Sequence, residues 1–97
     1  MKQDDLIKHF VNGDIDYINK KASALHIDTD YDSDNMTLWS YSIKLAEKNL
    51  ETEQLTLWGW ANYYTATTCQ HISKLKSYLY ENKIGYRVNN EHPNLGV

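Results

Sequence analysis

Cysteine, proline and phenylalanine are scarce in this chain, since each occurs once among 97 residues. The single cysteine, Cys69, excludes a disulfide bond within the chain and any zinc site built from several cysteines. No apolar run is long enough to span a membrane, and no signal-peptide pattern is present, so we expect a cytoplasmic protein without membrane contact. The only proline lies in the polar segment 89–97. We expect this segment to be a flexible tail on one single domain, residues 1–97.

The motifs of several enzyme classes are also missing. The chain has no glycine-rich phosphate loop, no G-x-S-x-G nucleophile motif and no H-E-x-x-H metal motif. Its four histidines are scattered, without the spacing of metal ligands. The one compact polar group is His71 with Thr67 and Thr68, where helix capping by Thr67 and packing explain the residues better than catalysis does. We therefore expect no catalytic residue, no metal and no cofactor, in a protein that is not an enzyme.

Tyrosine and tryptophan supply almost all of the aromatic content, with eight and three residues. The composition is 41% apolar and 12% aromatic, which is too rich for a disordered chain and enough for one modest core. Both residue types combine an apolar body with a polar tip, so they suit core edges as well as binding surfaces. Core-edge packing is the simpler interpretation of the composition alone.

Hydrophobic periodicity predicts an α+β fold. Helical spacing predicts one helix over about residues 4–12 and another over about 67–81, with Thr67 as the N-cap of the second. Alternating apolar residues predict strands at 24–29, 37–41, 43–46 and 54–60, and a short strand at 86–88. We expect a small antiparallel meander of three or four strands, flanked by an N-terminal and a C-terminal helix.

The tryptophans fall on one side of the predicted strands, and leucines on the other. Trp39 lies in one strand, and Trp58 and Trp60 lie in the last strand before the second helix. If these strands are adjacent, the three indoles form a cross-strand cluster together with Tyr41. Both faces are apolar, so we expect one of them to meet the helices and the other to be partly exposed. An exposed aromatic face is a candidate partner-binding surface.

The most polar stretch has a carboxylate at every second position: Asp28, Asp30, Asp32 and Asp34. Three interpretations stay open: a solvated loop, a calcium loop, or an acidic patch that meets Arg and Lys on a partner. A calcium loop needs glycine at position 6 and glutamate at position 12, where this chain has Ser33 and Trp39. In an extended row, carboxylates on one side lie roughly 6.5–7 Å apart, close to a single-strand phosphate step. Tyr31 is then a candidate aromatic anchor within the patch.

The net charge of −3 is unevenly distributed along the chain. Residues 1–34 hold eight acidic and four basic side chains, for a net charge of −4, whereas residues 35–97 carry a net charge of +1. Neither part has the basic density typical of a nucleic-acid footprint. The acidic part suggests either a basic partner or simple solvation.

Three pieces of the central segment share a pattern with known proteins: L-W-S-Y at residues 38–41, an aromatic-rich stretch at 58–64, and T-A-T-T-C-Q-H at 65–71. The segment resembles short proteins from phages and other mobile elements, which carry L-Y-S-Y, an aromatic strand and S-x-T-T-x-x-H at a helix start. Trp39 stands where tyrosine is usual, and Thr65 where serine is usual. The resemblance covers about half of the chain, implies a small phage-type accessory protein, and assigns no catalytic residue.

This resemblance implies that the chain acts by binding and blocking a host protein. Anti-CRISPR proteins are one class of such inhibitors, and several mimic nucleic acid. We therefore expect an inhibitor whose carboxylate row, from Asp28 to Asp34, occupies the basic nucleic-acid site of a host nuclease, such as a CRISPR effector nuclease in a bacterial cell. The alternative is a small nucleic-acid-binding regulator that uses the aromatic sheet face, which we favour less. The sequence is compatible with a monomer or a homodimer.

Overall fold

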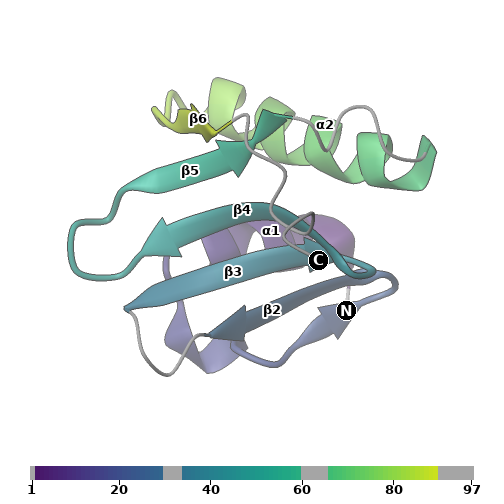
Figure 1. Cartoon of the computed structure of the whole chain (residues 1–97), viewed down its shortest axis with the longest axis horizontal. Helices are drawn as coiled ribbons and strands as arrows, with labels where there is room; N and C mark the ends of the chain where they lie inside the picture. Colours follow the sequence, from purple (N-terminus) through teal and green to yellow (C-terminus); the bar gives the residue numbers. More distant parts are fainter. Residues whose placement is uncertain (1, 30–33, 60–65, 90–97) are drawn as a thin grey trace.

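The computed structural model describes residues 2–29, 34–59 and 66–89, and its helices and strands build one layered α+β unit (Figure 1). The order of the elements along the chain is α1 (Gln3–Val11), the 3-10 turn η1 (Ile15–Tyr17), β1 (Lys21–Ala22), β2 (Leu25–Thr29), β3 (Asn35–Ser40), β4 (Ile43–Asn49), β5 (Leu55–Trp58), α2 (Ala66–Glu81) and β6 (Arg87–Asn89). The predicted α+β class is confirmed.

The sheet is larger than the predicted meander of three or four strands. Within the described residues it has six strands in the order β1 to β6, so the spatial order follows the chain order. Neighbours from β1 to β5 pair antiparallel, whereas β6 pairs parallel to β5. Parallel neighbours require a crossover connection, and α2 lies in that connection. The sheet is therefore mixed, with an antiparallel meander that ends in a β–α–β unit.

Both helices contribute to one core on one face of the sheet (Figure 1). Phe10 of α1 and Leu75 of α2 are fully buried, as are Leu38 and Leu57 of the sheet. The apolar positions of α1 recur at helical spacing, and those of β2 recur at every second residue, as the sequence predicted. Among the described residues, the buried apolar side chains of this core are Leu6, Ile7, Phe10, Val11, Ala22, Leu25, Ile27, Met36, Leu38, Ile43, Leu45, Ala46, Leu55, Leu57, Ile72, Leu75 and Leu79.

A β-bulge in β4 keeps the two faces of the sheet distinct. Leu38 pairs with Ala46 while the next residue, Trp39, pairs with Lys44, so Leu45 is the extra residue. Leu45 and Ala46 are consequently both buried, although they are consecutive. Trp39 and Lys44 stay opposite each other on the side of the sheet that the helices do not cover. We call this side the outer face.

The β3–β4 hairpin turns in two residues and carries backbone strain. Ser40 pairs with Ile43, which leaves Tyr41 and Ser42 as the turn. Tyr41 has φ 56°, a left-handed conformation that glycine adopts more readily, and 59% of its surface is exposed. Its backbone N–H donates to the carbonyl of Ala24 at 3.0 Å. The turn is thereby tied to the turn between β1 and β2.

Several predicted element boundaries shift. The N-cap of α1 is Lys2, without a side-chain capping bond, so Asp4 and Asp5 lie in the first turn. Thr67 is not an N-cap, because α2 already begins at Ala66. Asn89, predicted to start the flexible tail, is the last residue of β6. The remainder of that predicted tail lies outside the described residues. No helix among the described residues has the length and apolar character that crossing a membrane requires.

The core analysis generates a stability prediction. Leu38→Ala removes a fully buried side chain at the centre of the sheet. We expect a loss of about 2–5 kcal/mol in the free energy of unfolding, measured by urea denaturation, because a cavity remains in the core. Ile15→Ala is the matched control, since Ile15 is 62% exposed. The control should change stability by less than about 0.5 kcal/mol. Equal effects would contradict the placement of Leu38.

Candidate functional site

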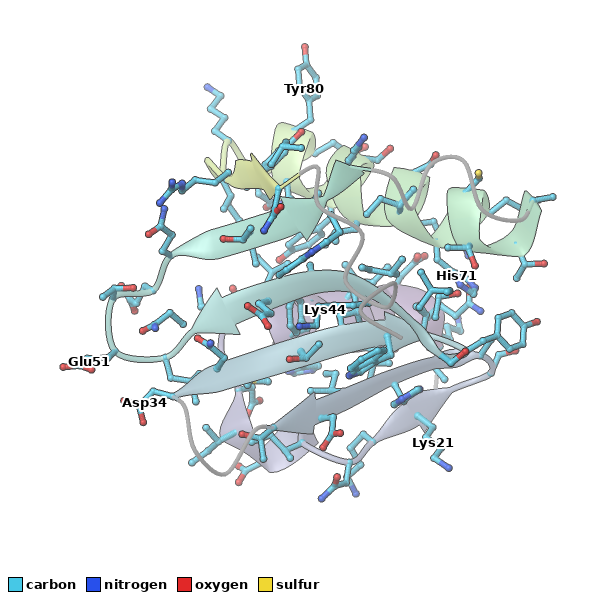
Figure 2. The ribbon with its side chains drawn as sticks, viewed as in Figure 1. Lys21, Asp34, Lys44, Glu51, His71 and Tyr80 are labelled. Carbon is cyan, nitrogen blue, oxygen red and sulfur yellow. The ribbon has the colours of Figure 1, made fainter. Side chains whose placement is uncertain are left out.

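Exposed carboxylates gather at one end of the sheet. The β2–β3 connection and the β4–β5 turn lie next to each other there, because the backbone N–H of Leu50 donates to the carbonyl of Asp34 at 2.7 Å. Figure 2 shows Asp34 and Glu51 projecting from this end. We call this surface the acidic end and define it by four exposed carboxylates: Asp28, Asp34, Glu51 and Glu53.

Local hydrogen bonds fix the β4–β5 turn and the described strand ends on either side of residues 30–33. The side-chain oxygen of Asn49 accepts from the backbone N–H groups of Glu51 and Thr52 at 2.9 and 2.8 Å, an arrangement that closes the β4–β5 turn. At the other connection, the Thr29 hydroxyl donates to the carbonyl of Asn35 at 3.2 Å. The Asp28 carboxylate accepts from the backbone N–H of Thr29 at 2.7 Å. The carboxylates are thus presented from fixed backbone.

The predicted carboxylate row is only partly described. Asp28 lies in β2 and Asp34 directly precedes β3, and both are exposed. Asp30, Tyr31 and Asp32 fall outside the described residues. Sequence reasoning missed the contribution of the β4–β5 turn, although a signal was present. In an antiparallel meander, every second connection returns to the same end of the sheet, so the connections after β2 and β4 had to be neighbours.

The tryptophans form a cluster on the outer face, but not the predicted one. Trp39 of β3 and Trp58 of β5 are separated by β4, and the ammonium of Lys44 lies between them, 5.9 Å and 4.7 Å from the two ring centroids. His26 of β2 stacks parallel to Trp39 with centroids 6.3 Å apart. We call these four residues the outer-face cluster. The expectation that the tryptophan strands are adjacent is wrong. Trp60 lies outside the described residues, and Tyr41 is in the hairpin turn.

The charged group of the outer-face cluster, the Lys44 ammonium, already has partners within the protein. Besides contacting both indoles, the Lys44 ammonium donates to the Glu47 carboxylate at 2.7 Å. Only 7% of Trp58 is exposed. An incoming base would have to displace Lys44 before it stacked on the Trp58 ring, so cation–π contacts compete with nucleic-acid binding here. This geometry favours a stabilising role for the cluster over a stacking role.

A buried polar network connects the sheet to both helices. The Ser40 hydroxyl lies 2.6 Å from Nδ1 of His71 and 3.2 Å from the Thr68 hydroxyl. Nε2 of His71 lies 3.2 Å from the side-chain amide nitrogen of Gln3. The side-chain amide oxygen of Gln3 accepts a hydrogen bond from the Lys74 ammonium at 2.8 Å. Ser40 and Thr68 are fully buried, and His71 is 3% exposed. Figure 2 places the His71 side chain at the edge of the sheet beside α2.

The contacts of Gln3 fix the tautomer of His71. Lys74 can only donate, so it must face the amide oxygen of Gln3. The amide nitrogen of Gln3 therefore donates to Nε2 of His71, which must accept. The ring proton consequently sits on Nδ1 and is donated to the Ser40 oxygen. The pKa of His71 is lowered from its ordinary value of 6.5, first by burial and then by the positive charge of Lys74.

This network ties elements together and is poorly arranged for catalysis. A histidine base would have to accept the proton of Ser40, whereas here His71 donates to Ser40. Both side chains are also enclosed, so a substrate cannot reach the hydroxyl. The sequence singled out His71 with Thr67 and Thr68 but missed Ser40 and Gln3. A serine on the leucine side of a strand was the available signal, because a buried hydroxyl needs a partner.

Comparisons with protein-family models, with curated proteins and with solved structures find no match for this chain. The resemblance to small phage proteins therefore stays a prediction. Within residues 2–29, 34–59 and 66–89, no group of three or more His, Cys, Asp or Glu side chains could hold a metal ion. The calcium interpretation of the carboxylate row depends on residues 30–33, which lie outside those ranges.

The lowered pKa of His71 predicts that acid destabilises the fold. Below pH 6.5 the unfolded chain binds a proton at His71 more readily than the folded chain does. The stabilisation is therefore fully present above pH 6.5 and is lost as the pH falls through 6.5 towards the lower pKa of the folded state. Urea unfolding at about pH 8 and about pH 5 measures the effect.

The matched variants are His71→Gln and His26→Gln. His71→Gln should lose less stability on acidification than the wild type, because glutamine does not titrate. His26→Gln should retain the wild-type pH dependence, since His26 is half-exposed on the outer face and contacts Trp39 outside the polar network. If His71→Gln and the wild type lose the same free energy of unfolding on acidification, His71 is not the source of the pH dependence.

Proposed function

We propose that this chain is a non-enzymatic binding protein that inhibits a host protein by occupying its basic site with the acidic end. The observation that carries the proposal is the proximity of two carboxylate-bearing connections, β2–β3 and β4–β5, joined through Leu50 and Asp34. A basic site that normally holds nucleic-acid phosphates matches this surface in charge. The proposed partner is the nucleic-acid site of a nuclease, with a CRISPR effector nuclease in a bacterial cytoplasm as the specific case.

Electrostatics gives this mode of inhibition two properties. Opposite charges about 4 Å apart near a protein surface interact by about 4 kcal/mol before desolvation is subtracted, so several carboxylates are needed to compete with phosphates. The same charges accelerate encounter with a basic partner, and salt screens that attraction. Asp30 and Asp32 lie between Asp28 and Asp34 in the sequence and add to the charge of the β2–β3 connection. Tyr31 is the proposed aromatic anchor of the same connection.

The outer face is the second candidate surface for a partner. Trp39 is half-exposed there, and His26 stacks on it. In the alternative function, a nucleic-acid-binding regulator, bases would stack on Trp39, Trp58, Tyr63 and Tyr64, and phosphates would contact Lys74, Lys76 and Arg87. The Lys44 contacts argue against that alternative, because the Trp58 ring already holds a cation at 4.7 Å. We therefore favour the acidic end as the binding surface, in a protein that acts as a monomer or a homodimer.

Neutralising the acidic end should abolish inhibition. The test variant combines Asp28→Asn, Asp34→Asn, Glu51→Gln and Glu53→Gln, all at exposed positions. We expect target cleavage by purified CRISPR effector nucleases to be blocked by the wild type. The variant should need at least about tenfold more protein for the same block, since each lost charge pair contributes up to about 1 kcal/mol. Raising the salt concentration should weaken wild-type inhibition in parallel.

The control variant changes the net charge equally at other exposed places: Asp4→Asn, Asp5→Asn, Asp16→Asn and Glu81→Gln. It should inhibit as well as the wild type does. Equal inhibition by the wild type and the acidic-end variant would refute the assigned surface. Absence of inhibition across a panel of nucleases would refute the proposed partner class.

A further inference from the structure

A groove of about 410 Å³ lies where α2 ends and the chain turns towards β6. We call it the Tyr80 groove. Its floor is apolar, with Leu79 and Ile84, and its walls carry Lys76, Tyr80, Lys83 and Tyr86. Figure 2 shows Tyr80 projecting away from α2, on a different side of the molecule from Asp34 and Glu51. The groove is therefore separate from the acidic end.

The end of α2 fixes Lys83 at the groove. The backbone N–H of Ile84 donates to the carbonyl of Leu79 at 2.9 Å, and that of Lys83 donates to Tyr80 at 3.2 Å. This pair of bonds is a Schellman motif with Lys83 at the left-handed position, φ 57°. Glycine is the usual residue there, and a side chain costs roughly 1 kcal/mol. Despite this cost, the residue at this position is a lysine, and it lines the groove.

Charge and exposed aromatic surface coincide at this groove. Lys76 and Lys83 line it, and no carboxylate is among its described lining residues. Arg87 follows directly in β6. Tyr80 is 85% exposed and Tyr86 is 40% exposed. The nearby Glu81 instead lines a different groove, between α1 and α2. The surface thus offers cations and accessible rings, and none of its described lining residues is an anion.

We propose that the Tyr80 groove binds a short segment of single-stranded nucleic acid, with a base stacked on Tyr80 and phosphates against Lys76 and Lys83. Charge complementarity requires an anionic occupant, and the ring exposure selects a nucleotide over an acidic peptide, because every base has a face that stacks on an aromatic side chain. The volume suits one or two nucleotides, since small-ligand pockets span about 300–1,000 Å³. Three cations are too few for a long duplex footprint.

This site is independent of the inhibitory function proposed above, so each can fail without the other. The test is fluorescence anisotropy of the full chain with a labelled oligothymidylate of about eight nucleotides, within the site sizes that single-strand-binding folds cover. We expect saturable binding at low salt. The logarithm of the binding constant should fall against the logarithm of salt concentration with a slope of about −1.4 to −2.1, as two to three phosphate contacts on a single strand predict.

Two variants test the assigned side chains. Tyr80→Ala should weaken binding about 5- to 100-fold by removing the stacked ring. Lys83→Gly keeps the backbone conformation that glycine prefers but removes the charge, so it should fold normally, bind more weakly and reduce the salt slope by about 0.7. Lys21→Gln is the matched control, since Lys21 is exposed in β1 at the opposite edge of the sheet, and it should bind as the wild type does (Figure 2).

The outcomes separate the possible occupants. The acidic-end variant described above should retain oligonucleotide binding, because it leaves the groove unchanged. Polyglutamate of matched charge should displace the oligonucleotide poorly. If polyglutamate binds as tightly and Tyr80→Ala has no effect on either ligand, the groove takes an acidic peptide and the proposal is wrong. Lack of saturable oligonucleotide binding by the folded wild type at low salt overturns it as well.

Discussion

The placement of both helices on one face of the sheet determines how the other surfaces of this protein are used. In so short a chain, one core must bury the apolar sides of α1, α2 and the inner strands together. Polar side chains that fall inside that core must find partners there, as Ser40 does with His71. Charged side chains are consequently displaced to the sheet ends, the helix ends and the outer face, where Lys44 joins Trp39 and Trp58.

The connections between the strands determine at which end of the sheet the other charged side chains lie. Those that follow β2 and β4 carry Asp34 and Glu51 to one end, while the tight β3–β4 turn presents Tyr41 at the other. The basic side chains Lys76 and Lys83 gather instead where α2 ends. Although the net charge is −3, the acidic end and the Tyr80 groove carry charges of opposite sign. Such polarity orients a molecule in the field of a charged partner before contact is made.

Local sequence patterns were enough to predict most helices and strands but not the contacts between them. The strand predicted at residues 24–29 is observed at Leu25–Thr29, one residue shorter. Strict alternation fixes both its type and its buried side. β1 has two residues, too few for any alternation to be visible. The contact between Gln3 and His71 joins residues 68 positions apart, and no local pattern encodes it. The bulge at Leu45 and the insertion of Lys44 between two indoles likewise depend on strand pairing, which periodicity alone does not specify.

The parallel pairing of β6 with β5 leads us to expect that β6 pairs after the antiparallel strands have paired. Every other strand contact joins neighbours in the chain, so hairpins such as β3–β4 close short loops and can form early. β6 pairs only after the whole of α2 has crossed the sheet, and the described part of this strand has three residues at an edge. We therefore expect residues 84–89 to join the native structure late and to leave it first. Local opening at this edge would separate β6, with Arg87, from β5 while the antiparallel meander stays intact.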